Sequence, residues 1–374
     1  MNLLASLYEE LVCKCEEIDK AWKGEEYSLA AFPDIVLAST SRLDLTPFGK
    51  LDELIQLLSD PTLARLQQLS SFSDLYIKLY DNGRFWVEIL NWWGSDINIH
   101  DHDFAGIQFQ LCGCSLNVDY SFAESQKYDD LCFGTVSVTG ARIWRPGDRS
   151  VSLPGRKTPH NVCHLDLPTV SLLIRTHPVR SFGPQWNYFP PGTAGNYGIA
   201  DATFRKSVAG LRLLARGDRA QFRRAFSWHV AHAKPAQLLF TLIKMIDIVF
   251  EPEFVDVVHD IAAVGDPLQE GIIEAAAFHR AIEALKAFRH RSQLSWSERV
   301  ALAIMGSSFD SRSIEDISDN LGANECEGDA LPVLCSLGNK SEDARTTIDT
   351  ALSLFQLNPS SSVSASASSW CEPL

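Results

Sequence analysis

Residues 82–116 read NGRFWVEILNWWGSDINIHDHDFAGIQFQLCGCSL, in which short runs of β-branched and aromatic residues alternate with turn residues. Comparable runs lie on either side, at YIKLY (76–80), GTVSVTGARIW (134–144) and TVSLLIRT (169–176). Turn signals separate the runs, namely Asn82-Gly83, Gly94-Ser95, Pro146-Gly147 and Pro154-Gly155. Several short strands with Gly and Pro between them are typical of an antiparallel sandwich or barrel. The pattern predicts such a β block, ending near Arg175.

The β block is flanked by segments in which apolar residues recur at helical spacing. Before it, leucines at positions 3, 4, 7 and 11 and the stretch 52–69 share this period. After it, residues 178–200 are rich in Pro, Gly and aromatics, and residues 201–320 return to helical spacing. We therefore predict an α+β chain in four parts. These are an N-terminal helical segment (1–72), a β-barrel domain (73–178), a packed linker with an α-helical domain (179–355), and a disordered serine-rich tail (356–374).

The composition is that of an ordinary globular protein and argues against several kinds of partner. Of 374 residues, 45% are hydrophobic and 21% are charged, and the formal net charge is −14. An anionic surface repels phosphate backbones, so we expect no binding to nucleic acid. The nine cysteines are scattered and odd in number, which favours reduced thiols. Because the sequence lacks a signal-peptide pattern and a long apolar run, we expect a cytoplasmic protein that binds no membrane.

Two histidines, His100 and His102, lie in the segment INIHDHDF, which alternates like a strand. Residues two apart on a strand point to the same face, so both imidazoles can aim at one point inside a barrel. Neutral imidazole is a ligand for Fe, Zn, Cu and Ni. A metal site needs a third ligand from elsewhere, and both His160 and His164 are candidates. The alternative is that the pair forms only a polar face of a strand.

Two further features favour a metal site. Gly94 precedes the pair in a G-x5-H-x-H pattern, and some sixty residues later Pro154-Gly155 is followed by His160. This arrangement resembles the two motifs of the cupins. The stretch quoted first and HNVCHLDLPTVSLLIRT (160–176) are similar to stretches of the cysteine dioxygenase-like cupins, which are three-histidine non-haem iron enzymes. The resemblance covers roughly residues 75–176 and implies an antiparallel cupin barrel (jelly roll) for the β block.

The resemblance also implies a set of metal ligands. His100, His102 and His160 would hold Fe(2+), with Zn, Ni and Mn as alternatives. We prefer His160 to His164 because it follows Pro159 and better matches the first histidine of the family stretch. His164 would then orient a ligand by hydrogen bonding, or replace His160 in the ligand set.

The chain departs from the family pattern at several positions. Cupins usually carry a glutamate after the second histidine, with a gap of three or four residues. Here those positions are occupied by Gly106 and Ile107, and the absence of a carboxylate fits a three-histidine site. The Ser-His-Tyr set of thiol dioxygenases is matched by Ser171, Leu173 and Arg175, so only the serine is retained. The cysteine that vertebrate-type enzymes crosslink to that tyrosine would lie near Ile107 and is also missing. These departures put cysteine in doubt as the substrate.

Four residues are candidates for binding the substrate. Arg175 shares a strand face with Ser171, and its guanidinium can bind a carboxylate through two hydrogen bonds. The alternative for Arg175 is a surface or interface ion pair. Gln108 can share the face of His102 and bind substrate or a metal-bound water, or it can simply fill the barrel. Lys78 lies near the position of the family's carboxylate-binding arginine.

We therefore predict a metal-dependent oxidoreductase, a non-haem Fe(II) dioxygenase of the three-histidine cupin type. Its partners would be O₂ and a small-molecule substrate, such as a thiol or an amino-acid-derived metabolite. Two alternatives stay open. The first is a cupin that binds metal without redox chemistry, such as an isomerase, a hydrolase or a sensor. The second is an interaction scaffold with a vestigial barrel. The sequence also leaves open a homo-oligomer.

Overall fold

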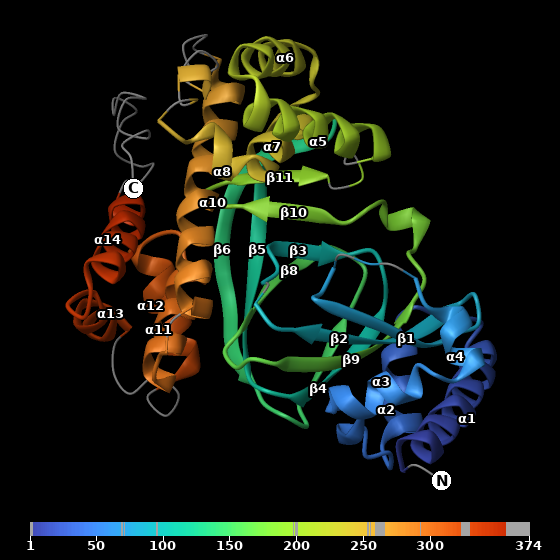
Figure 1. Cartoon of the computed structure of the whole chain (residues 1–374). Helices are drawn as coiled ribbons and strands as arrows, with labels where there is room; N and C mark the ends of the chain where they lie inside the picture. Colours follow the sequence, from blue (N-terminus) through green and yellow to red (C-terminus); the bar gives the residue numbers. More distant parts are fainter. Residues whose placement is uncertain are drawn as a thin grey trace.

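The computed structural model describes residues 3–68, 70, 72–94, 96–196, 198, 201–252, 254, 256–258, 266–291, 293–322 and 330–356. Within these residues, two β-sheets lie between a group of N-terminal helices and a larger C-terminal helical half (Figure 1). Beyond its first residue, the tail predicted at 356–374 lies outside the described part of the chain. Among the helices described, none is long and apolar enough to cross a bilayer.

The first sheet is antiparallel, with the strand order β1-β2-β9-β4-β7. Its strands are β1 (Leu75–Asp81), β2 (Phe85–Trp92), β4 (Gly106–Cys112), β7 (Arg149–Ser152) and β9 (Thr169–Thr176). Alternation divides the residues of each strand between two faces. Val87 and Ile89 face a hydrophobic cluster formed with the N-terminal helices, whereas Glu88 and Leu90 face a cavity between the sheets.

The second sheet closes into a barrel in the order β10-β11-β6-β5-β8-β3, with β3 paired to β10. Its strands are β3 (Ile99–His102), β5 (Ser115–Tyr128), β6 (Leu131–Trp144), β8 (Gly155–His164), β10 (Trp186–Phe189) and β11 (Thr193–Asn196). The long hairpin β5–β6 forms the wall of the barrel on the side of α10 (Figure 1). The predicted antiparallel barrel is therefore confirmed.

The barrel extends beyond residue 178, where the sequence placed its boundary. β10 and β11 lie in the segment that we interpreted as a linker, yet β10 pairs with β3 and β11 pairs with β6. Each of these two strands has four residues. Alternation over so few residues is too weak to stand out among prolines, glycines and aromatics.

Helices cover both sides of this β structure. The outer face of the first sheet packs on α1 (Leu3–Gly24), α2 (Phe32–Thr40), η1 (Thr46–Gly49), α3 (Leu51–Leu57) and α4 (Pro61–Leu66), while η2 (Arg180–Phe182) precedes β10. The C-terminal half contains α5 (Ala202–Gly217), α6 (Arg219–His232), α7 (Pro235–Lys244), α8 (Ile246–Val249), α10 (Pro267–Arg291), α11 (Trp296–Ser307), α12 (Ser311–Leu321), α13 (Ala330–Gly338) and α14 (Glu342–Gln356). The long helix α10 runs along the barrel wall and joins its hydrophobic core (Figure 1).

Candidate metal centre

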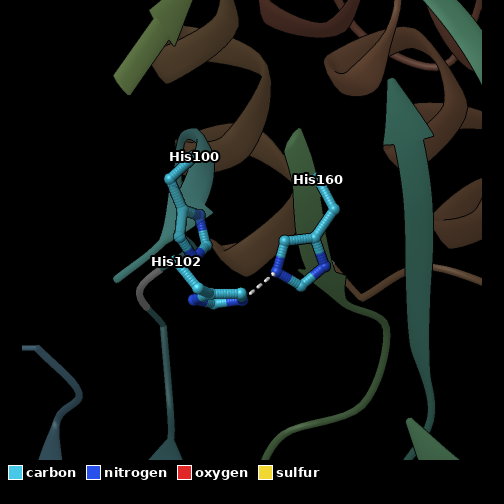
Figure 2. Close-up of side chains that lie close together, drawn as sticks. All are labelled: His100, His102 and His160. Carbon is cyan, nitrogen blue, oxygen red and sulfur yellow. Dashed lines mark hydrogen bonds between the residues drawn. The ribbon is translucent and has the colours of Figure 1, made fainter. Parts of the chain in front are cut away.

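The three histidines expected as ligands come together on the inner wall of the barrel. His100 and His102 lie on β3, and His160 lies on the paired strand β8, directly opposite His100. Figure 2 shows the three imidazoles turned toward one another. One nitrogen of each ring lies within 4.8 Å of the other two, so the group can hold a metal ion.

Hydrogen bonds fix two of the rings. Nδ1 of His100 lies 2.8 Å from the backbone oxygen of Asn98, and Nδ1 of His160 lies 2.8 Å from Oδ1 of Asn117. The amide nitrogen of Asn117 donates to Asp119, which turns its oxygen toward His160. Because these oxygens only accept hydrogen bonds, each Nδ1 carries the proton. The lone pair is then on Nε2, which is free to bind a metal.

The third ring completes a donor set that fits a divalent cation. Nε2 of His102 lies 2.9 Å from Nε2 of His160 (Figure 2). Two nitrogens bound to one ion at about 2.1 Å, with a right angle between them, are themselves about 3 Å apart. Nδ1 of His102 is buried and has no hydrogen-bond partner among the described residues. The spacing of the two Nε2 atoms therefore matches neighbouring ligands of a single ion.

Burial keeps these imidazoles neutral. It lowers the pKa of His100 to about 4, and it holds the pKa values of His102 and His160 well below their usual range. Only the neutral ring offers a lone pair to a metal, so the site is ready for an ion at neutral pH. Among the described residues, the group of possible metal ligands consists of these three histidines and includes no carboxylate.

The aspartate between the two β3 histidines faces away from them. Asp101 accepts hydrogen bonds from the backbone nitrogen of Trp186, at 2.8 Å, and from the hydroxyl of Tyr188, at 2.9 Å. Burial raises the pKa of Asp101 to about 6. Its role is to fasten β3 to β10, because both donors lie on that closing strand.

The histidines open onto a cavity of about 390 Å³ between the two sheets. Its walls are formed by Trp86, Glu88, Leu90, Trp92, Gln108, Ser171, Leu173 and Arg175 of the first sheet and by His100, His102, His160, Val162 and His164 of the barrel. A cavity of this volume lies within the range of small-molecule binding sites.

Arg175 lies beside the histidines inside this cavity. Its Nε is 3.3 Å from Oε1 of Glu88, and the guanidinium lies over the rings of Trp86 and Phe104, at 4.1 and 4.0 Å. The ring of Phe104 in turn lies 4.5 Å from that of His102. Burial lowers the pKa of Arg175, while Glu88 acts against this shift. The guanidinium is thus enclosed by one carboxylate and two aromatic rings next to the candidate metal site.

The other predicted residues are divided between the cavity and its surroundings. Gln108, Ser171 and His164 line the cavity. Lys78 does not belong to the lining; it forms an ion pair with Asp81 at 2.8 Å and lies over the ring of Trp86. Its role in binding the substrate stays a prediction, and Lys78 already has a carboxylate partner on its own strand.

Sequence reasoning missed three residues that support the site. Glu88 pairs with Arg175, Asn117 orients His160, and Phe104 packs between His102 and Arg175. Strand alternation places Glu88 on a buried face, and a buried carboxylate predicts a nearby cation. No sequence signal marked Asn117, because its partner lies 43 positions away.

Two sequence motifs, G-x5-H-x-H and the later histidine after Pro-Gly, thus meet on paired strands of one closed barrel. This is the arrangement that the resemblance to cupins predicted. Searches of family models and of curated proteins give no match.

Several solved structures are similar to part of this chain. One is hydroquinone 1,2-dioxygenase from Sphingomonas sp. TTNP3, with 10% identity over 29% of this chain and 68% of that one, and a TM-score of 0.23. Another is a cupin superfamily protein from Desulfitobacterium hafniense, with 14% identity, coverage of 30% and 86%, and a TM-score of 0.20. A third is a DMSP lyase from Ruegeria pomeroyi, with 17% identity, coverage of 30% and 53%, and a TM-score of 0.19. Similarity at this level carries no conclusion about the family or the activity of this protein.

Proposed function

We propose that this protein is an Fe(II)-dependent oxygenase of the three-histidine cupin type, which combines O₂ with a small molecule in the cavity between its sheets. The observation that supports the proposal is the set of three neutral imidazoles on the cavity wall, with no carboxylate in the group. Three protein ligands leave open positions on an octahedral ion, as in the facial triads of non-haem iron oxygenases.

His100, His102 and His160 would hold the ion, each through one ring nitrogen. Bound there, Fe(II) would supply the activation of O₂ and a template for the substrate. The neutral donor set leaves the full charge of the ion uncompensated by the protein, which favours an anionic substrate group beside it.

Arg175 is the residue that we propose to orient such a group. Its guanidinium can bind a carboxylate through two parallel hydrogen bonds. Glu88 holds the guanidinium from one side, and the rings of Trp86 and Phe104 cover it. These rings exclude water, so the attraction between the cation and a bound anion is stronger than in solvent.

The decisive experiment is metal analysis of freshly isolated protein followed by anaerobic Fe(II) loading and measurement of O₂ uptake with a panel of small thiols, amino acids and carboxylates. We expect near-stoichiometric iron in the wild type and loss of both metal and O₂ uptake in His102→Ala. His229→Ala is the control, because His229 lies on α6 and bonds Thr241 instead. Protein that retains Zn and is inert to O₂ would support a non-redox cupin, and absence of any metal would exclude both readings.

A further inference from the structure

The end of the cavity away from the candidate metal site carries two buried polar groups that lack partners among the described residues. They are Nε2 of His164 and Oγ of Ser171. The two residues are 3% and 1% exposed, and both line the cavity. A buried donor without a partner destabilises the folded state, so such groups call for an explanation.

Strand geometry places these groups far from the metal ligands. His164 follows His160 by four residues on β8, and Ser171 precedes Arg175 by four residues on β9. A strand rises about 3.3 Å per residue, so each pair is separated by about 13 Å. The cavity is therefore elongated, with the histidine triad and Arg175 at one end and His164 and Ser171 at the other.

Neighbouring residues fix the ring of His164. It stacks on Trp92, with centroids 4.7 Å apart and planes 18° from parallel. Its Nδ1 lies 3.1 Å from Oγ of Ser115, and that oxygen accepts a hydrogen bond from the amide of Gln110 at 3.4 Å. The amide occupies one lone pair of Ser115 and leaves its hydroxyl hydrogen for Nδ1.

This chain of hydrogen bonds sets the tautomer of His164. With Nδ1 accepting from Ser115, the ring proton lies on Nε2, the atom without a partner. Burial lowers the pKa of His164 to about 4, so the ring is neutral at pH 7. The far end of the cavity therefore offers two uncharged donors, the Nε2–H of His164 and the hydroxyl of Ser171.

We propose that His164 and Ser171 bind an uncharged, hydrogen-bond-accepting oxygen of the substrate at the end of the cavity opposite the metal. The side chains of Leu90, Val162 and Leu173 line the space between the two ends, which suits an apolar spacer or ring. The inference rests on the proposed function only in taking this cavity as the substrate site. The substrate is then an extended molecule with polar groups at both ends, and a small amino acid such as cysteine would leave most of the cavity length unfilled.

Acetophenone and ethylbenzene form the matched pair of probes that tests this recognition, because both are a phenyl ring with a two-carbon substituent and only acetophenone carries an accepting oxygen. Dissociation constants would be measured by ligand-detected NMR titration of the Zn(II)-loaded protein. We expect acetophenone to bind about fivefold to tenfold more tightly than ethylbenzene, the effect of a hydrogen bond worth about 1 kcal/mol. Because O₂ and iron take no part, this result is independent of whether the protein proves to be an oxygenase.

Three variants complete the test. In Ser171→Ala and His164→Phe the preference for acetophenone should fall to less than twofold; the phenyl ring keeps the stacking on Trp92. Leu173→Met, which removes no donor and conserves volume, should keep the wild-type preference. Equal affinity for the two probes in the wild type, failure of both to bind, or a preference that survives both donor variants would overturn the proposal.

Discussion

The hydroxyl of Tyr188 on β10 donates a hydrogen bond to the carboxylate of Asp101 on β3, over 2.9 Å. Asp101 stands between two ligand candidates, His100 and His102, but faces the opposite side of their strand. The carboxylate thereby joins the strand that carries the histidines to the strand that closes the barrel.

Removing this link tests how far barrel closure supports the site. In Tyr188→Phe the buried carboxylate loses a donor, so we expect a loss of about 1–3 kcal/mol in the free energy of unfolding. Metal affinity should fall severalfold because β3 is held less firmly. Urea denaturation and metal titration measure the two effects. Tyr128→Phe, at the end of β5, is the control, and unchanged metal affinity in Tyr188→Phe would contradict the prediction.

Asn117 offers a second test, because its Oδ1 orients His160 at 2.8 Å. Loss of a partner that orients a ligand typically lowers metal affinity by about 10–100-fold. We expect a decrease of this size in Asn117→Ala, measured by competition with a chelator. Ser121→Ala, at an exposed position of the same strand, is the control and should keep the wild-type affinity. Unchanged metal affinity in Asn117→Ala would contradict the prediction.

Close packing at Gly106 leaves no room for a side chain at one of the two positions where the resemblance to cupins would place a glutamate. A Cβ at this position would lie 2.7 Å from the backbone oxygen of Ile174 and 2.9 Å from Cβ of Arg175. Ile107, the other candidate position, is fully buried against the N-terminal helices. We expect Gly106→Ala to destabilise the fold by about 1–3 kcal/mol through overpacking, as measured by thermal unfolding.

The matched control for Gly106 lies on β6. A Cβ at Gly140 would meet only Oδ2 of Asp119, at an ordinary 3.7 Å. Gly140→Ala should therefore leave stability within about 0.5 kcal/mol of the wild type. Similar melting temperatures for the two alanine variants would show that β9 can shift to accommodate a methyl group at position 106 without loss of stability.

The ion pair between Arg175 and Glu88 predicts a strong asymmetry between single and double variants. Arg175→Gln leaves a carboxylate that is 5% exposed without its cation, and such a change typically costs about 3–5 kcal/mol. Glu88→Gln in the same chain should recover most of that loss. A double-mutant cycle in urea measures the coupling. A coupling energy below about 0.5 kcal/mol would show that the ion pair contributes little to the free energy of unfolding.

Acid sensitivity follows from His279 on α10, which packs edge-on against Phe189 with ring centroids 5.5 Å apart. Burial lowers the pKa of His279 from 6.5 to about 4. Between these values the unfolded chain takes up a proton that the folded chain does not, so stability is lost as pH falls from 6.5 toward 4. The slope contributed by one such group approaches about 1.4 kcal/mol per pH unit.

The matching measurement compares denaturation midpoints at pH 7 and pH 5. His279→Gln should lose less stability over this interval than the wild type, since its side chain does not titrate. His232→Gln, on the exposed face of α6, should behave like the wild type. An unchanged pH dependence in His279→Gln would show that other groups dominate the loss.

The part of the site that follows from strand period could be predicted from the sequence. Alternation by two placed His100 and His102 on one face, and it also placed Ser171 and Arg175 together on the cavity wall. The pairing of β3 with β8 could not be read from the sequence. It came from the family resemblance, which selected His160 as the partner of the first two histidines.

Other elements were missed for physical reasons. β5 (Ser115–Tyr128) was not predicted, because its second half is exposed on the long hairpin and lacks alternation with a buried face. The same strand carries Ser115 and Asn117, which orient His164 and His160. Long-range hydrogen bonds of this kind depend on strand register, and local spacing says nothing about register.

The closing strands β10 and β11 have a consequence for how this protein can be divided. They belong to the barrel by hydrogen bonding, yet they immediately precede the C-terminal helices. A chain cut at residue 178 would leave the edges of β3 and β6 without partners, and open edges promote association between molecules. Recombination or domain exchange would have to keep residues up to Asn196 together with the barrel. The boundary at which the chain can be divided therefore lies between β11 and α5, well past the last metal-binding motif.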